Sequence, residues 1–231
     1  MKARKVKRLD PEGTLAENAA RIVQVRLGEL RSFAPGALDP SESEMQHDLR
    51  IAAKRLRYIL EATDFCFGRA GSAARRRAKE IQDLLGEVHD ADVMLPRLHE
   101  HRDLMREEDA AFVLLRAEGA TDLDPELAAR APHRTTYRGL EVLEVYLVAR
   151  RKLLFDRFVA LWEECEQKSV WNALDRAADR EIERAAEARR QAERAERARV
   201  ALAAAEKARQ EAEALAAEAA AELAEAERNR A

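Results

Sequence analysis

The segment 46-QHDLRIAAKRLRYIL-60 constrains the fold more than any other part of the chain, because its apolar residues recur at the spacing of an α-helix. At about 3.6 residues per turn, one side of this helix carries apolar side chains only. They are Leu49, Ala52, Ala53, Leu56, Ile59 and Leu60. We expect that side to face a core built from other helices.

Composition extends the expectation of helix to the whole chain. The 231 residues include only eight glycines. Hydrophobic residues make up 47%, much of it alanine, and charged residues reach 37%, which is above the share typical of globular proteins. This combination predicts an all-α protein with one sizeable core, or a core with an extended appendage.

Turn and breaker residues divide the first part of the chain into separate expected helices. Pro35-Gly36 and the turn from Gly68 to Gly71 should end the first two, and Pro96 should kink the third. A loop at 119–132 should hold a single helical turn at 125–130. The expected helices span about 14–33, 40–67, 72–102, 102–118 and 137–166. The last should bury Leu140, Leu143, Leu147, Leu154, Phe158 and Leu161, with Tyr146 beside them.

The composition changes after Trp171. Residues 181–231 are almost entirely Ala, Glu, Arg, Gln and Lys, with ten basic and 12 acidic residues. This favours a long helix with many i,i+4 charge pairs, but one that is weak as a coiled coil because apolar heptads are not sustained. We interpret it as a solvated helix, with a partner-binding or self-associating arm as the alternative. The expected organisation is a frayed basic tail at 1–11, a helical bundle at 12–171 and an extended charged helical arm at 172–231.

Cysteine usage and hydropathy bear on the compartment. Cys66 and Cys165 lie far apart and fit neither a disulfide framework nor a CxxC site, so we expect reduced, partly buried thiols. No apolar run approaches the roughly 20 residues of a membrane span. The basic N-terminus lacks the apolar region of a secretory signal. These features predict a soluble cytoplasmic protein without a membrane partner.

A row of basic side chains lies on a second side of the helix at 46–60. His47, Arg50, Lys54 and Arg57 follow one another at helical spacing over about 15 Å, and Arg55 projects separately. Within 47–57 one aspartate is set against four permanent cations, in a chain whose net charge is −3. Such a row repels itself, and folding does not require it. Either an anion lies along it, for which arginine and lysine suit phosphate oxygens, or it is an ordinary solvated face.

Two further basic clusters could belong to the same surface. Arg75, Arg76, Arg77 and Lys79 lie at the start of the third expected helix, where cations oppose the helix dipole, and Arg75, Lys79 and Gln82 share one face. A solvated basic turn is the alternative. The residues 150–152 form another cluster, for which the same surface and a solvated face both stay open.

The residues described so far resemble the CHAD family, the conserved histidine α-helical domain. The segment 47-HDLRIAAKRLRYIL-60 looks like the family signature H-x-x-R-x-x-x-[KR]-R-x-R. The segment 84-LLGEVHDADVMLPRL-98 looks like the family's LG-x-x-RD-x-DV, with His89 where the family usually has arginine. The resemblance covers about 12–167.

The resemblance implies an all-α, four-helix-bundle-type CHAD repeat that binds inorganic polyphosphate without catalysis, metal or cofactor. Carried onto this chain, the signature positions are His47, Arg50, Lys54, Arg55 and Arg57, with Arg75, Arg76 and Lys79 as a softer extension.

Family members usually contain two such repeats, whereas the signature occurs once in this chain, which therefore looks like a half-length member. Either one repeat makes a shorter or weaker contact with a polyanion, or two chains associate. A two-fold homodimer is the simpler geometry for association.

Three other functions compete with polyphosphate binding. Nucleic-acid binding is disfavoured by the negative net charge and the lack of an aromatic stacking platform. An enzyme would need metal-holding carboxylates or an activated nucleophile; His89 and Asp92 share a helical face, but a capping or core role suits them better. A structural protein at polyphosphate granules, with the C-terminal helix as its contact arm, is compatible with polyphosphate binding.

Overall fold

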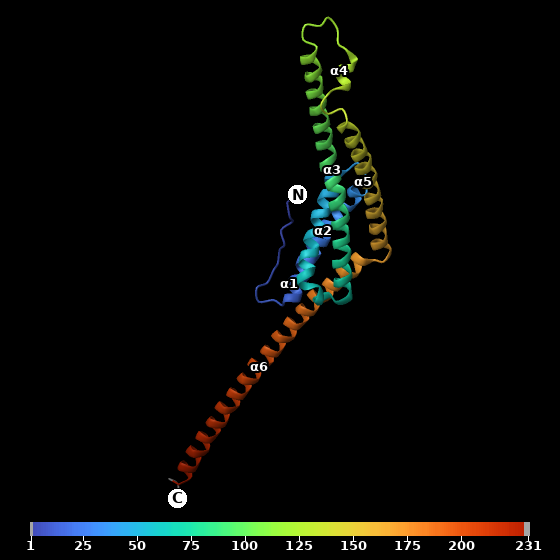
Figure 1. The fold of residues 1–231 in the computed structure, drawn as a ribbon. Helices are drawn as coiled ribbons and strands as arrows, with labels where there is room; N and C mark the ends of the chain where they lie inside the picture. Colours follow the sequence, from blue (N-terminus) through green and yellow to red (C-terminus); the bar gives the residue numbers. More distant parts are fainter. Residues whose placement is uncertain (1, 229–231) are drawn as a thin grey trace. The chain divides into compact units, whose positions relative to one another are not determined.

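The computed structural model describes residues 2–228, which form helices and no strand, so the predicted all-α class is confirmed. Figure 1 shows the order of the elements. They are α1 (Leu15–Ala37), α2 (Ser43–Thr63), the short 3-10 helix η1 (Asp64–Phe67), α3 (Gly68–Arg116), α4 (Pro125–Ala129), α5 (Thr136–Gln167) and α6 (Val170–Arg228). None of the helices in the described residues is both long enough and apolar enough to cross a membrane.

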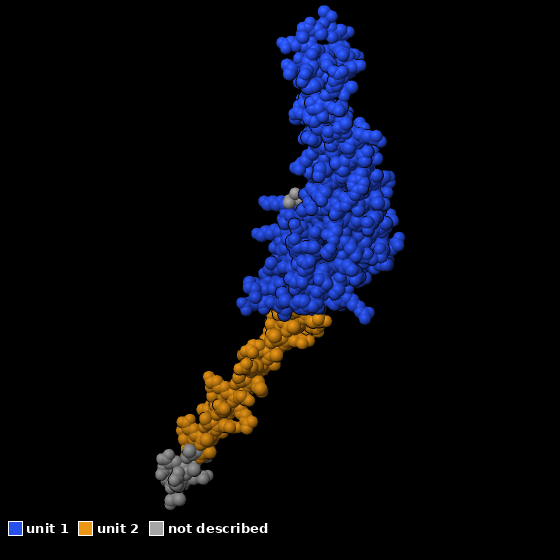
Figure 2. All heavy atoms as spheres, in the orientation of Figure 1, with its two compact units in different colours: residues 1–181 blue, residues 182–231 orange. Residues whose placement is uncertain are grey.

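The chain divides into two compact units, residues 1–181 and 182–231, coloured separately in Figure 2. The second unit is the helical continuation of α6, and its described side chains are exposed almost throughout. The first unit contains the helical bundle. Its boundary at Glu181 lies ten residues beyond the change of composition at Trp171.

The N-terminal segment is fixed to α1, where a frayed tail was expected. The backbone N–H of Arg4 donates to Glu29 Oε1 (2.5 Å), and its guanidinium donates to Ser32 Oγ (3.0 Å). Arg26 donates to the carbonyl of Arg4 (3.1 Å). Arg26 also donates to Glu29 Oε2 (2.8 Å), so both oxygens of this almost fully buried carboxylate are hydrogen-bonded, which offsets the cost of burying it.

The first helix ends later than Pro35-Gly36 predicted. Thr14 caps α1 by accepting a hydrogen bond from Glu17 N–H. The helix then continues through Pro35 to Ala37. A Cβ on Gly36 would come within 2.9 Å of Met45 Cγ, so this glycine allows α1 and the start of α2 to approach closely.

The third helix is one element, where the sequence predicted two. The expected turn from Gly68 to Gly71 is replaced by η1, and α3 begins at Gly68 itself, whose φ of 56° suits glycine. The helix runs through Pro96 and past Arg102 to Arg116, about 74 Å at 1.5 Å per residue. Side-chain contacts with α5 lie on both sides of Pro96 and support this continuity, through Asp92 before it and His99 after it.

The helix α5 returns antiparallel along α3, after the expected helical turn at α4 (Figure 1). Leu154 and Phe158 are buried as predicted, together with Phe155, Trp162 and Cys165. Leu143 is 40% exposed, so its predicted place in the core is wrong, and Tyr146, which was expected beside the apolar face, is 57% exposed. Both residues lie off the side of α5 that contacts α3, and the opposite side of this helix faces solvent.

The core of the first unit lies between α1, α2, the first half of α3, the second half of α5 and the start of α6. Trp171 packs against Trp162 at 5.8 Å between ring centroids. One turn further along α6, Asp175 accepts a hydrogen bond from Arg31 of α1 at 2.8 Å. The largest fully buried apolar side chains are Trp171, Phe158, Leu27, Leu30, Leu49, Leu56, Leu60, Ile81, Leu85 and Leu174.

Candidate functional site

The helix α2 presents two sides, as its periodicity predicted. Leu49, Leu56 and Leu60 are fully buried against the core. The basic row, His47, Arg50, Lys54 and Arg57, lies at the edge of that buried side and is partly exposed along its length. The stems of these side chains therefore rest on the protein while their charged ends can reach solvent.

The facing side of α3 carries a matching row. The rings of His47 and His89 lie 4.7 Å apart between centroids, and Arg75 pairs with Asp64, just after α2, at 3.0 Å. These two contacts fix an antiparallel alignment of α2 and α3. Between them, successive turns of α3 present one face to the basic row, formed by Arg75, Lys79, Gln82, Gly86 and His89. We call the two rows together the basic seam.

Acidic neighbours are distributed unevenly along the basic seam. Arg57 contacts Glu61 at 3.5 Å, and Lys79 contacts Asp83 at 2.5 Å. In contrast, within residues 2–228, neither Arg50 nor Lys54 has an acidic partner within 4 Å. The centre of the seam is therefore the part with uncompensated positive charge.

Three buried polar atoms at the seam also lack hydrogen-bond partners among the described residues. They are Nε of Arg50, Nε of Arg57 and Oε1 of Gln82. Buried donors and acceptors are normally paired, so each of these atoms can accept a partner from solvent or from a ligand. The ring of Tyr58 lies beside the same region, 4.7 Å from Arg57 Cζ and 5.7 Å from Lys54 Nζ. These cation–π contacts help to hold both cations in place.

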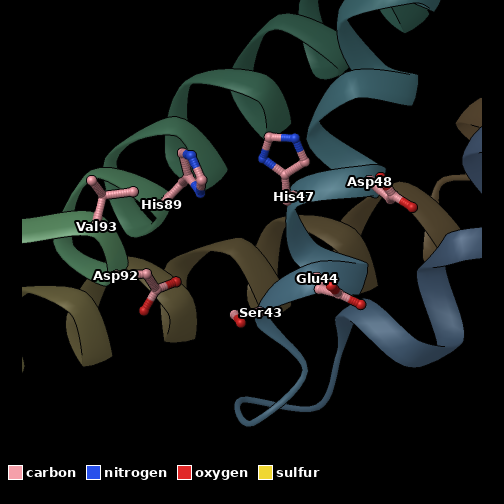
Figure 3. A pocket seen from close by; sticks show the side chains of 7 residues that line it. All are labelled: Ser43, Glu44, His47, Asp48, His89, Asp92 and Val93. Carbon is pink, nitrogen blue, oxygen red and sulfur yellow. The ribbon is translucent and has the colours of Figure 1, made fainter. Parts of the chain in front are cut away.

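An open cavity of about 590 Å³ lies at the His47 end of the seam. Figure 3 shows His47 and His89 projecting toward each other from α2 and α3. The remaining lining residues are Ser43, Glu44, Asp48, Asp92 and Val93. The carboxylates make this end less favourable for an anion than the centre of the seam.

The protonation of His47 depends on its surroundings. Partial burial, followed by the positive charge of Arg50 and the nearby His89, lowers the pKa of His47 below its ordinary value of 6.5. The Nδ1 atom of His47 lies 3.5 Å from an Arg50 guanidinium nitrogen. A neutral imidazole can accept a hydrogen bond from that guanidinium, whereas an imidazolium would repel it.

Two residues of the predicted site lie apart from the seam. Arg55 points toward α1, where its guanidinium is 3.8 Å from the buried Glu29 carboxylate. Arg76 is exposed, about 100° around α3 from Arg75. The three residues 150–152 also lie outside the seam, and each pairs with a carboxylate. Arg150 pairs with Glu87, Arg151 with Asp92, and Lys152 with Asp156.

The sequence did not reveal the hydrogen-bond network at the His47 end of the seam. Arg151 binds Asp92 and also donates to Gln46 Oε1 at 3.2 Å, so it joins α5 to α3 and α2. Asp92 is thus held by an arginine from another helix, which only the tertiary fold reveals. The α3 half of the seam did carry a signal, since positions 75, 79, 82, 86 and 89 alternate at spacings of four and three.

This arrangement suits binding of an extended anion. The seam offers guanidinium and ammonium donors in line along two packed helices. Across the described residues, no group of three or more His, Cys, Asp or Glu side chains is arranged to hold a metal ion. The surface is open along its length, which fits a linear ligand better than a compact one.

Comparison with known proteins identifies the region that contains the seam. Residues 2–99 match the family model of the CHAD domain. The matched region begins ahead of α1 and ends within α3, so it includes both halves of the basic seam. No curated protein and no solved structure matches the chain.

Proposed function

We propose that this protein, whose residues 2–99 match the family model of the CHAD domain, binds inorganic polyphosphate along the basic seam. Arg50 and Lys54 form the centre of the proposed site. His47, Arg57, Arg75 and Lys79 extend it in both directions. Arg55 and Arg76 fall outside it.

The observation that carries the proposal is the missing counter-charge at the centre of the seam. Arg50 and Lys54 lie one helical turn apart, without an acidic partner among the described residues, and Arg50 Nε is buried and unsatisfied. Cations held close together repel each other unless an anion lies between or beside them. A chain of phosphates supplies acceptor oxygens at every unit, so it can satisfy several donors at once.

The proposed mechanism is electrostatic. Binding neutralises the seam and releases the counterions condensed on the polyanion, so affinity should fall steeply with salt, as it does for nucleic-acid backbones. Polyphosphate carries no nucleobases that a protein could recognise. Accordingly, Tyr58 is the one aromatic side chain beside the seam among the described residues, and it is engaged by Lys54 and Arg57.

We propose binding without catalysis. Glu61 and Asp83 serve as ion-pair partners of the outer cations of the seam, Arg57 and Lys79. Association with polyphosphate granules would follow from the same binding. The exposed helix at 182–228 is then available as a contact arm in such an assembly.

Titration with long-chain polyphosphate at two salt concentrations tests the proposal. We compare wild type with Arg50→Gln/Lys54→Gln. The matched control is Arg116→Gln/Arg130→Gln, which removes the same charge from exposed sites at the end of α3 and just after α4. The seam variant should bind at least tenfold more weakly and with a shallower salt dependence, while the control stays near wild type.

Circular dichroism establishes that each variant is folded. Equal losses in the seam variant and the control would show that only net charge matters, and the seam would be rejected as the site. Displacement of bound polyphosphate by equal concentrations of RNA would favour nucleic acid instead.

A further inference from the structure

The outer side of α5 has the pattern of a helix that packs against another helix. Opposite the face that contacts α3, residues recur at alternating spacings of four and three. They are Arg138, Val142, Val145, Ala149, Lys152 and Asp156, and we call them the outer stripe. This is the heptad spacing with which helices pack side by side at a shallow angle. Its apolar part lies in the middle and its charges lie at the ends.

The apolar part of this side is exposed to solvent. Val142 is 64% exposed and Val145 is 70% exposed. Three more large apolar side chains flank them: Tyr146 at 57%, Val148 at 52% and Leu153 at 60%. Together they present on the order of 500 Å² of apolar surface, at the upper end of the largest patch on a typical monomer. A helix that is apolar on both sides is normally buried on both sides.

We propose that the outer stripe pairs antiparallel with the outer stripe of a second copy of this chain. The apolar centre provides the driving force, and Ala149 lets the two helices approach closely. A groove of about 480 Å³, lined by Val145, Val148 and Ala149 and bordered by Glu141 and Glu144, offers room for the side chains of the second copy.

The charges at the two ends of the outer stripe favour a second copy of this chain as the partner, and they favour antiparallel pairing. Arg138 lies nine residues before Leu147 and Asp156 lies nine residues after it, so each is about 13.5 Å from the middle of the stripe. A two-fold axis at Leu147 brings Arg138 of each copy against Asp156 of the other. A parallel pair would place like charges together instead.

The same axis places Val145 opposite Ala149 of the second copy and Val142 opposite the aliphatic stem of Lys152. Among the described residues Arg138 has no acidic partner of its own, whereas Asp156 contacts Lys152 at 2.7 Å. The second copy therefore supplies the missing partner of Arg138. The contact is isologous, so it closes at two chains.

This proposal does not rest on polyphosphate binding, because the outer stripe lies on α5 and the seam lies between α2 and α3. Sedimentation of the full chain over a range of concentrations tests it without any ligand. Wild type should sediment as a dimer, and Val145→Asp should be a folded monomer, since Val145 is exposed within one chain. The matched control is Val200→Asp, at a 60% exposed valine of α6, and it should remain dimeric.

A monomeric wild type, or a dimer that Val200→Asp breaks and Val145→Asp does not, would overturn the proposal. The second result would move self-association to α6.

The direction of pairing has its own test. Arg138→Asp and Asp156→Arg should each raise the dimer dissociation constant several-fold, and the charge-swapped double variant should restore it. In a Cys66→Ser background, oxidising a mixture of Val145→Cys and Ala149→Cys proteins should give mixed disulfide dimers. Each protein alone should give few. Efficient crosslinking of Val145→Cys alone would indicate parallel pairing and reject the geometry.

Discussion

Individual cations on α2 differ in their role according to the neighbour that each one meets. Arg50 and Lys54 meet no carboxylate among the described residues, whereas Arg55 meets the buried Glu29. Neighbouring positions in one basic segment thus divide between the proposed binding site and the packing of α2 on α1. Periodicity placed Arg55 away from the row, but only the fold shows that Glu29 lies at the end of its side chain.

The pH dependence of binding follows from His47. Its pKa is lowered in the free protein by burial, by Arg50 and by His89, so it is neutral near pH 7. A polyphosphate chain beside it reverses the balance, because anionic oxygens favour the imidazolium. We expect affinity for polyphosphate to rise between pH 7.5 and pH 5.5. The His47→Gln variant should lose much of that increase in the same titration.

The opposite sign is expected for stability. Because the folded-state pKa of His47 lies below its ordinary value, folding favours the neutral ring. Its contribution is complete above pH 6.5 and is lost as the pH falls through that value toward the folded-state pKa. Glu44, Asp48, Asp92 and His89 face the same cavity, so the His47→Gln comparison isolates its share. A pH profile of binding unchanged by this variant would contradict the assignment of His47 to the site.

At the scale of elements, one carboxylate joins the ends of α3 and α5. Asp109 accepts hydrogen bonds from the Tyr137 hydroxyl (2.7 Å) and from both the backbone N–H and Nδ1 of His133 (3.1 and 2.9 Å). Desolvation opposes its ionisation, but these hydrogen bonds prevail and lower the pKa of Asp109. The bonds stabilise the tip above the carboxyl's ordinary pKa, and this stabilisation is lost as the pH falls through the lowered value.

Asp109→Ala should therefore loosen the tip of the α3–α5 hairpin. Amide hydrogen exchange should become faster at residues 119–137, and the thermal midpoint should fall. Polyphosphate binding should not change, because the seam lies elsewhere on α3. Asp103→Ala is the matched control, since its side chain is 61% exposed. Equal exchange in the two variants would show that the hydrogen bonds of Asp109 do not hold the tip.

Local sequence signals predicted those elements whose ends are set by residues nearby in the sequence. The core side of α2, the turn at α4 and the extent of α5 all followed from the spacing of apolar residues and from turn and breaker residues. The length of α3 did not, because contacts with α5 carry the helix through Pro96. Only half of the seam could be predicted, for the same reason. Periodicity revealed the basic row on α2, but the alignment of that row with α3 depends on a packing contact between His47 and His89.

At the scale of the whole molecule, the start of α6 belongs to the bundle. Trp171, Leu174 and Ala178 are buried, and Asp179 accepts a hydrogen bond from Gln24 of α1 at 2.6 Å. The change of composition at Trp171 therefore precedes the boundary between the two units, which lies after Glu181. Composition cannot place this boundary, because alanine and arginine suit both a packed and a solvated helix.

Two truncations test where the bundle ends. A chain ending at residue 181 should keep the thermal midpoint of the full chain and its affinity for polyphosphate, because every residue of the seam and its support remains. A chain ending at residue 171 should be far less stable, since loss of one buried leucine alone costs about 2–5 kcal/mol and Leu174 is fully buried. Calorimetry and the same titration measure both.

If the shorter chain melts like the longer one, residues 172–181 do not support the bundle. If the longer chain folds but binds weakly, the helix beyond residue 181 takes part in binding, and the seam would not be the complete site.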